Sequence, residues 1–172
     1  MNYEVEQKYR IQNPAPFRKK LKSLGAKKIS SGAEYNEFYA HPLLVKKIFK
    51  IRLRRTAKKS TLTLKGARLP SSFTKRLELE TPVDFSTAQA ILKFLDFQRG
   101  FSYTKKREEY RSGTCLITLD KLPKLGWFLE IEGAESQIRR IEKKFGLKTK
   151  DREMKSYFEM LAGLSHPGSR VA

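Results

Sequence analysis

The chain has 172 residues, 39% of them hydrophobic, which is enough for one domain with a sizeable core. Its 37 Lys and Arg residues against 18 Asp and Glu residues give a formal net charge of +19, which attracts polyanions such as nucleic acid, polyphosphate and nucleotides, or an anionic membrane surface. The lone Cys115 excludes an intrachain disulfide, and no leader or membrane-spanning segment is recognisable, so we expect a soluble, cytoplasmic protein.

The first predicted element is a strand over residues 2–11, in which apolar and charged side chains alternate. The apolar face carries Tyr3, Val5, Tyr9 and Ile11, and the charged face carries Glu4, Glu6, Lys8 and Arg10. A period of two predicts a strand. On a single surface strand, such a charged face would simply be solvated.

Further strands and four helices follow in order. Strands are predicted over residues 27–40, 48–56, 60–67, 73–83, 101–111, 114–121 and 127–133. The first helix has Asn13 as its cap, Pro14 at its first position and Gly25 at its end. The others are a helix opened by a capping box of Ser86 and Gln89, then helices over 136–145 and 153–163, with a turn or short helix over 43–47. On the second helix, we expect Ala90, Ile91, Phe94 and Leu95 to face inward.

The alternation of the first strand recurs along the chain. It places on one face Arg52 and Arg54, then Thr61, Thr63 and Lys65, then Arg76, Glu78 and Glu80, then Lys105 and Arg107, and finally Glu130 and Glu132. Several strands with one apolar and one charged face predict a barrel, with helices covering the apolar faces and the charged faces lining the interior. Residues 1–164 would form this single domain, and residues 165–172 a flexible tail.

Such an interior contains two kinds of ligand. Paired acids such as Glu4 and Glu6, two residues apart on one strand face, can bridge a hard cation, and Mg²⁺ or Mn²⁺ suits oxygen ligands. Arginine and lysine side chains bind phosphate oxygens. The competing interpretation is that the charges only neutralise one another across strands. Buried ion pairs contribute little to stability, which favours a site for a polyanion and a metal.

These residues, in this order, resemble the CYTH family of triphosphate tunnel metalloenzymes. The resemblance covers nearly the whole chain and is carried by Glu4-x-Glu6-x-Lys8, Arg52-x-Arg54, Thr63-x-Lys65-Gly66, Arg76-x-Glu78-x-Glu80, Lys105-x-Arg107-x-x-Tyr110, Leu119-Asp120, Leu125-Gly126-x-Phe128-x-Glu130-x-Glu132 and Ser156-Tyr157. It implies an α+β fold in which an eight-stranded antiparallel β-barrel forms a tunnel with a charged lumen and helices packed on the outside.

The resemblance also implies roles for individual residues. Those expected to bind the triphosphate are Lys8, Arg52, Arg54, Lys65, Arg76, Lys105 and Arg107. Those expected to bind Mg²⁺ or Mn²⁺ are Glu4, Glu6, Asp120, Glu130 and Glu132. The expected catalytic residues are Glu78, Glu80 and Lys8, with Glu78 and Glu80 supporting a second metal or orienting the attacking water.

Two positions depart from the family pattern. Where relatives often carry Asp two residues before an aromatic pair, this chain has Asn36, before Phe38 and Tyr39. Thiamine triphosphatases tend to carry Trp two residues before the first Arg of the Arg-x-Arg pair, where this chain has Lys50, so a stacking partner for a thiazole ring is missing. Trp127 shares a face with apolar residues and is expected to pack.

Three functions remain open. The favoured one is a metal-dependent hydrolase of inorganic triphosphate or nucleoside triphosphates. The alternative is a class IV adenylate cyclase, in which the ribose 3′-hydroxyl attacks the α-phosphorus and releases pyrophosphate. A non-enzymatic polyphosphate- or RNA-binding module is the third. The expected partner is a small triphosphate and not a membrane, with nucleic acid secondary; the chain could be a monomer or a homodimer.

Overall fold

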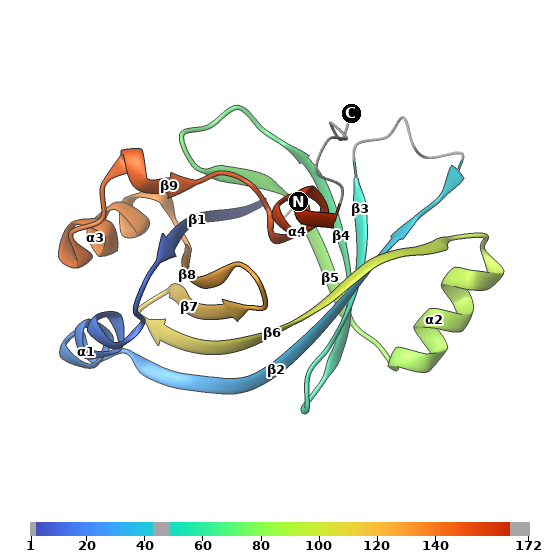
Figure 1. The fold of residues 1–172 in the computed structure, drawn as a ribbon, viewed down its shortest axis with the longest axis horizontal. Coiled ribbons are helices and arrows are strands. Elements are labelled where there is room, and N and C mark those ends of the chain that lie inside the picture. Colours follow the sequence, from blue (N-terminus) through green and yellow to red (C-terminus); the bar gives the residue numbers. More distant parts are fainter. Residues whose placement is uncertain (1–2, 43–48, 166–172) are drawn as a thin grey trace.

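The structure, a computed structural model, describes residues 3–42 and 49–165 (Figure 1). This part of the chain contains eight strands of six or more residues, and helices follow the first, the fifth and the eighth of them. The strands are β1 (Tyr3–Ile11), β2 (Lys27–Ala40), β3 (Lys50–Arg55), β4 (Ser60–Arg68), β5 (Thr74–Pro82), β6 (Gln98–Ser112), β7 (Cys115–Leu122) and β8 (Gly126–Glu132), and a two-residue strand β9 (Arg152–Glu153) pairs with β1.

The eight strands close into an antiparallel barrel. Hydrogen-bonded neighbours follow the order β5-β4-β3-β2-β6-β7-β8-β1, and β1 also pairs with β5, with Glu4 opposite Arg76. Closure leaves the eight strands without an open edge and separates an inner from an outer face. The predicted α+β fold, a closed eight-stranded antiparallel barrel with helices outside, is therefore confirmed.

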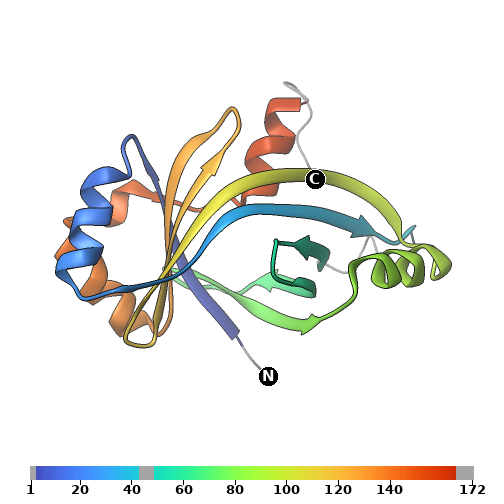
Figure 2. The same ribbon diagram turned by 90° about the horizontal axis from the view of Figure 1, so that it is seen from below.

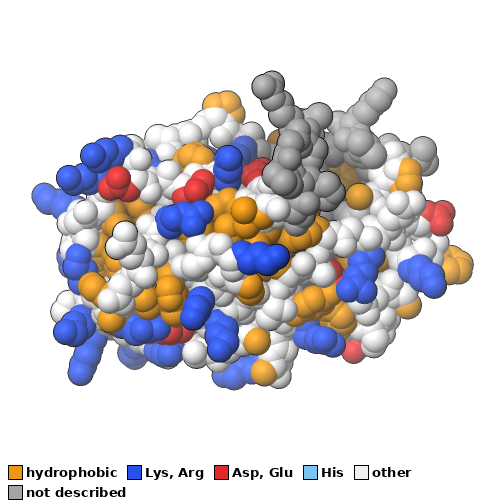
Figure 3. Space-filling view, in the orientation of Figure 1, with side chains coloured by type: hydrophobic (Ala, Val, Ile, Leu, Met, Phe, Trp, Pro, Cys, Tyr) orange, Lys and Arg blue, Asp and Glu red, His pale blue; other side chains and the backbone are white. Residues whose placement is uncertain are grey.

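The first three helices cover apolar outer faces of the strands, and the fourth packs against inward-facing apolar residues such as Leu122 and Phe128. The helices are α1 (Ala15–Ser23), α2 (Phe85–Phe94), α3 (Glu135–Phe145) and α4 (Tyr157–Ser165), with a short 3₁₀ turn over Thr149–Asp151. Figures 1 and 2 show α1 and α3 together at one end of the barrel and α2 at the other. Lys and Arg side chains are scattered over the face seen in Figure 3, with few acids between them.

Three apolar clusters hold the helices in place. Beneath α1 and α3, outward residues of β1, β7 and β8 such as Tyr9 and Leu129 pack against Ile138 and Phe145 of α3. Beneath α2 the cluster consists of Tyr39, Leu53, Ala88 and Leu92. At α4 it consists of Leu122, Leu125, Phe128, Tyr157, Met160 and Leu161. Cys115 is a buried free thiol, as expected.

The prediction for α2 was wrong in its start and its orientation. Asp84, not Ser86, caps the helix: the Asp84 carboxylate accepts the backbone N–H of Thr87 at 2.8 Å and the Ser86 hydroxyl at 2.7 Å. Ala88 and Leu92 are the buried residues. The four residues expected to face inward are exposed, namely Ala90, Ile91, Phe94 and Leu95. Because α2 has apolar residues on both faces, its composition did not reveal which face packs.

The last helix also differs from the expectation. A helix was predicted over residues 153–163, but the helix begins at Tyr157. Residues 152–153 form a short strand that pairs with β1 instead. The predicted turn or short helix over 43–47 lies outside the described residues, as does nearly all of the predicted tail. Among the residues that are described, no helix combines the length and apolar character needed to cross a bilayer.

Glu108 of β6 ties α1 to the barrel. Its carboxylate accepts hydrogen bonds from Arg18 Nη2 at 2.6 Å and Arg18 Nε at 3.1 Å, and from the Tyr110 hydroxyl at 2.7 Å. The hydrogen bonds from Arg18 are the largest cause that lowers the pKa of Glu108 from 4.5 to about 2. Because the pKa is lower in the folded state, this pairing stabilises the fold above pH 4.5 and is lost as the pH falls toward 2.

We therefore predict that Glu108→Gln lowers the free energy of unfolding by about 1–2 kcal/mol at pH 7, since Arg18 is partly solvent-screened. Urea unfolding at a series of pH values should show the difference from wild type shrinking below pH 4.5. A difference that stayed constant down to pH 3 would contradict the assigned role of the charge.

Candidate active site

The barrel encloses a cavity of about 540 Å³. It is lined by the charged faces that the strand alternation predicted: every proposed site residue except Asp120 contributes to its wall. Asp120 is fully buried behind the wall. The structure thus brings together residues from β1, β3, β4, β5, β6 and β8 that are far apart in sequence.

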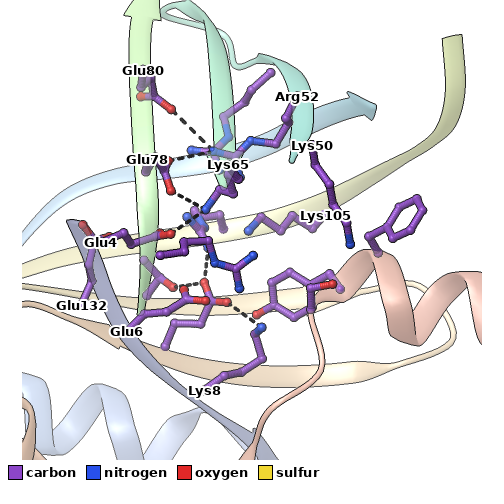
Figure 4. Close-up of a pocket in the computed structure, with 18 of the residues that line it drawn as sticks. Glu4, Glu6, Lys8, Lys50, Arg52, Lys65, Glu78, Glu80, Lys105 and Glu132 are labelled. Atoms are coloured by element: carbon purple, nitrogen blue, oxygen red, sulfur yellow. Dashed lines mark hydrogen bonds and ion pairs between the residues drawn. The ribbon is translucent and has the colours of Figure 1, made fainter. Parts of the chain in front are cut away.

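Acids and bases are concentrated on different sides of the cavity. The neighbouring strands β8, β1 and β5 supply the acidic side, with Glu130, Glu132, Glu4, Glu6, Glu78 and Glu80. The opposite strands β3 and β6 supply Arg52, Arg54, Lys105 and Arg107. Figure 4 shows the labelled glutamates along one side of the cavity, with Lys50, Arg52 and Lys105 across from them. A ligand in between would contact both signs of charge.

Several of these charges pair across strands. Lys65 of β4 bridges two acids, with its Nζ 2.8 Å from Glu4 Oε2 and 2.5 Å from Glu78 Oε2. Arg52 Nη2 lies 3.4 Å from Glu78 Oε1 and 3.5 Å from Glu80 Oε2. Lys8 Nζ lies 3.3 Å from Glu130 Oε1. These contacts hold the side chains in fixed positions inside the tunnel.

Two carboxylates are not neutralised in this way. Glu6 of β1 stands directly opposite Glu132 of β8, and neither forms an ion pair with any residue that the structure describes. Burial, and then the charges of Glu4, Glu6 and Glu78, raise the pKa of Glu132 to about 7. Burial, followed by the charges of Glu4 and Glu130, likewise raises the pKa of Glu6. Facing acids without a base are an arrangement that a divalent cation would stabilise.

The donor chemistry of this pair fits Mg²⁺ or Mn²⁺, which prefer carboxylate oxygens. Glu4 and Glu130 are nearest in sequence to the pair, but they are turned toward Lys65 and Lys8. Within residues 3–42 and 49–165, no group of three or more His, Cys, Asp or Glu side chains is gathered closely enough to form a ready-made metal site. The individual ligand assignments therefore stay predictions.

Asp120 anchors the bases of β6. Its Oδ1 accepts a hydrogen bond from Arg107 Nε at 2.7 Å, and its Oδ2 accepts from Arg107 Nη2 at 2.6 Å, Lys105 Nζ at 2.9 Å and the Tyr157 hydroxyl at 3.0 Å. Arg107 Nη2 also lies 2.5 Å from Glu130 Oε2. In this arrangement both oxygens of Asp120 are engaged, so its expected role as a metal ligand stays a prediction.

Two arginines keep unused donors at the cavity. The Nε atoms of Arg52 and Arg76 are buried, and neither has a hydrogen-bond partner among the described residues. Arg76 also forms no ion pair in that part of the chain, although it stands opposite Glu4 in the strand register. Buried guanidinium donors without acceptors are costly unless a ligand supplies the acceptors. An anion with several oxygens would do so.

Glu34 of β2 is a site residue that the sequence analysis missed. It is almost fully buried, and its Oε1 lies 3.3 Å from both Arg54 Nε and Lys105 Nζ. Burial alone would raise its pKa, but the charges of Lys105, Arg107 and Arg54 hold the pKa of Glu34 well below its usual value. The available signal was its position two residues before Asn36, on the same strand face.

Asn36 links this acid to the arginine pair. Its Nδ2 donates to Glu34 Oε1 at 3.1 Å, and its Oδ1 accepts from Arg54 Nε at 3.3 Å. The residue that replaces the family's usual Asp thus orients Arg54 without adding a charge. Trp127 is half-buried against the outer core, as expected, with Arg18 and Lys121 near its ring.

The comparison with known protein families agrees with this architecture. Residues 2–157 match the CYTH domain. The chain belongs to the CYTH family. Members of this family are triphosphatases or adenylate cyclases that act on small triphosphates and generally depend on divalent metals. No curated protein matches the chain.

Solved structures of CYTH-like proteins share the fold. A protein of Pyrococcus horikoshii is 28% identical, with a TM-score of 0.78, over 91% of this chain and 98% of its own. A Vibrio parahaemolyticus protein provisionally assigned as an adenylate cyclase is 24% identical, with a TM-score of 0.78, over 94% and 98% of the two chains. A Hippeastrum protein whose dominant activity is that of a triphosphatase is 15% identical, with a TM-score of 0.69, over 95% and 96%.

Removing the charge of Glu34 should destabilise the CYTH barrel. Glu34→Gln would leave Lys105 and Arg54 without their shared acid, and breaking a buried pair on one side costs about 3 kcal/mol. Urea unfolding at pH 7 measures this loss. The matched control is Glu135→Gln, on the first turn of α3, which should change stability by less than about 1 kcal/mol. Equal effects of the two variants would contradict the assigned role of Glu34.

Proposed function

We propose that this protein is a divalent-metal-dependent hydrolase of triphosphate substrates. The observation that carries the proposal is that one cavity contains two kinds of unsatisfied group. Glu6 and Glu132 face each other without a base, and Arg52 and Arg76 have buried donors without acceptors, in each case among the described residues. A triphosphate bound with a metal would satisfy both groups, because its oxygens accept from the arginines and its metal neutralises the acids.

The bases would hold the phosphate chain. Arg52, Arg54, Lys65, Arg76, Lys105, Arg107 and Lys8 surround the cavity and would donate to its oxygens. Contacts with Glu34, Asp120 and Glu130 already fix Lys105 and Arg107, so these two would need little reorganisation on binding. Their charges would stabilise the negative charge that develops on the oxygens during phosphoryl transfer.

The metal would be held by carboxylates of the acidic side. Glu6 and Glu132 are its best-placed ligands, with Glu4, Glu130 and Asp120 as the further candidates. Bound there, Mg²⁺ or Mn²⁺ supplies Lewis-acid stabilisation of the phosphate oxygens.

Glu78 and Glu80 are proposed to orient the attacking water. Burial opposes their ionisation, but for Glu78 a hydrogen bond with Glu4 and the charges of Lys65 and Arg52 lower the pKa. For Glu80, a hydrogen bond from Thr63 and the charges of Arg54 and Arg52 do so. Both carboxylates are therefore ionised at neutral pH, where they accept hydrogen bonds from water but are weak proton acceptors.

The alternative reaction is cyclisation of ATP to cyclic AMP and pyrophosphate. The observation that favours it is that rings as well as charges line the cavity, including Tyr103 and Phe158. The Vibrio parahaemolyticus neighbour is provisionally assigned to this reaction, whereas the Hippeastrum neighbour is dominantly a triphosphatase. The two reactions differ in which phosphorus meets the nucleophile.

One assay separates these functions. The purified protein is incubated with ATP or inorganic triphosphate, with Mg²⁺, Mn²⁺ or chelator, and orthophosphate and cyclic AMP are followed together. We expect metal-dependent orthophosphate without cyclic AMP. Cyclic AMP with matching pyrophosphate would establish the cyclase instead. If neither product forms with any metal, the non-enzymatic polyanion-binding module is the remaining function.

Glu6→Gln should abolish metal-dependent turnover, because it removes one of the two facing carboxylates. Thermal unfolding gives a second readout: Mn²⁺ should raise the Tm of wild type but not of Glu6→Gln. Glu135→Gln, outside the barrel, is the control for a lost carboxylate. Turnover by Glu6→Gln at the wild-type rate would remove Glu6 from the metal site.

Arg54→Ala should raise KM for the triphosphate by about tenfold or more, since a charge-assisted hydrogen bond contributes about 1.5–3 kcal/mol. Arg55→Ala is the matched control. Arg55 is the next residue on β3, and its guanidinium lies over the Phe85 ring, 4.6 Å from the centroid, outside the cavity. Similar KM values for the two variants would contradict the assignment of Arg54 to substrate binding.

A further inference from the structure

One section of the cavity wall is aromatic. Phe38, Tyr103 and Phe158 line it together with Lys50. They come from three separate elements, since Phe38 lies in β2, Tyr103 in β6 and Phe158 in the first turn of α4. Aromatic rings offer no ligand to phosphate oxygens or to a hard cation, so the phosphate and metal chemistry described above makes no use of them.

The three rings form a continuous surface. Phe38 stacks on Tyr103, with centroids 6.1 Å apart and an interplanar angle of 23°, and contacts Phe158 at 5.2 Å. All three rings are only partly buried. Apolar surface that faces an open, charged cavity is unfavourable until another apolar surface covers it. The buried ring of Tyr157, in contrast, is already covered by the cluster at α4.

The ring surface adjoins the phosphate-binding bases. In the strand register Phe38 stands directly opposite Arg52, which places their Cβ atoms about 5 Å apart. Asn36 pairs with Arg54 on one side and with Tyr103 on the other. A ligand whose phosphates are held by Arg52 and Arg54 would therefore have its next chemical group against the rings.

Polar groups lie at the border of this surface. Lys50 Nζ is 4.6 Å from the centroid of the Phe158 ring and 3.7 Å from Glu159 Oε1. The Tyr103 hydroxyl makes no hydrogen bond within the described part of the chain. Stacking surface with a few hydrogen-bonding groups beside it is the chemistry that binds a nucleobase.

We propose that Phe38, Tyr103 and Phe158 form a nucleobase subsite, so that the substrate is a nucleoside triphosphate rather than inorganic triphosphate. This inference rests on the proposed binding of triphosphate in the same cavity. The competing explanation is that the rings only pack α4 against the barrel. Phe101 allows the two explanations to be distinguished. Its ring packs against Phe158 and Tyr103, with centroids 5.7 Å and 6.1 Å away, but it does not line the cavity.

The test compares Phe158→Leu with Phe101→Leu. Isothermal titration calorimetry measures the binding of ATP and of inorganic triphosphate, each with Mg²⁺ and with chelator, to wild type and both variants. We expect Phe158→Leu to weaken ATP binding about tenfold more than inorganic triphosphate binding, as expected for the loss of a base-stacking ring. Phe101→Leu, which only disturbs packing, should affect the two ligands alike.

Equal weakening of both ligands by Phe158→Leu would overturn the subsite, as would tighter binding of inorganic triphosphate than of ATP to wild type. Thermal unfolding checks that the variants are folded. If Phe158→Leu does not fold, Phe38→Leu provides the same comparison. Orthophosphate release is followed in parallel. If Phe158→Leu selectively loses ATP binding but wild type releases no orthophosphate, the nucleobase subsite stands and the hydrolase is rejected. If wild type releases orthophosphate but Phe158→Leu weakens both ligands equally, the hydrolase stands and the subsite is rejected.

Discussion

The structure depends on the pairing of buried opposite charges inside a closed sheet. Moving charges out of water is costly, and close pairing with extra hydrogen bonds offsets that cost only in good geometry. Asp120 shows what this requires: its two oxygens accept four hydrogen bonds, from Arg107, Lys105 and Tyr157. The barrel supplies such geometry because antiparallel register fixes which side chains face one another. The same register leaves Glu6 opposite Glu132, so the place where pairing fails is set by the fold as firmly as the places where it succeeds.

The excess positive charge of the protein does not come from this lumen. The nine bases that line the cavity face seven acids that line it and two more, Glu34 and Asp120, that are buried in or behind its wall. Among the described residues, the charges in and behind the cavity wall therefore balance, and the net charge of +19 arises elsewhere in the chain. The two sets of charge have different physical consequences. The outer field attracts any polyanion and is screened by salt, whereas the balanced lumen distinguishes ligands by the arrangement of their oxygens and metal.

Strand alternation was enough to predict the barrel and the residues that face its interior. A period of two in residues 2–11 and its recurrence predicted the inward side of six of the eight strands, and all but one of the proposed site residues line the cavity. The order of strands around the barrel could not be predicted from the residues alone, because it depends on pairings between distant segments. The ion pairs of Glu34 and the enclosure of Asp120 follow from that order. The orientation of α2 was missed for a related reason, since a helix with apolar residues on both faces is oriented by its cap at Asp84 and by what lies beneath it.

The substitution at Asn36 illustrates how the lumen keeps its balance. Family members often carry an acid at this place, whereas here Glu34 supplies a carboxylate two residues earlier on the same strand face. Asn36 then donates to Glu34 and accepts from Arg54, which fixes both without a further charge. An Asp at position 36 would stand beside Glu34, and two adjacent buried acids raise each other's pKa unless more bases or a cation surround them. The basic side of the cavity is thus held in place by two buried acids, Glu34 and Asp120, while Arg52 keeps an unused donor for a ligand.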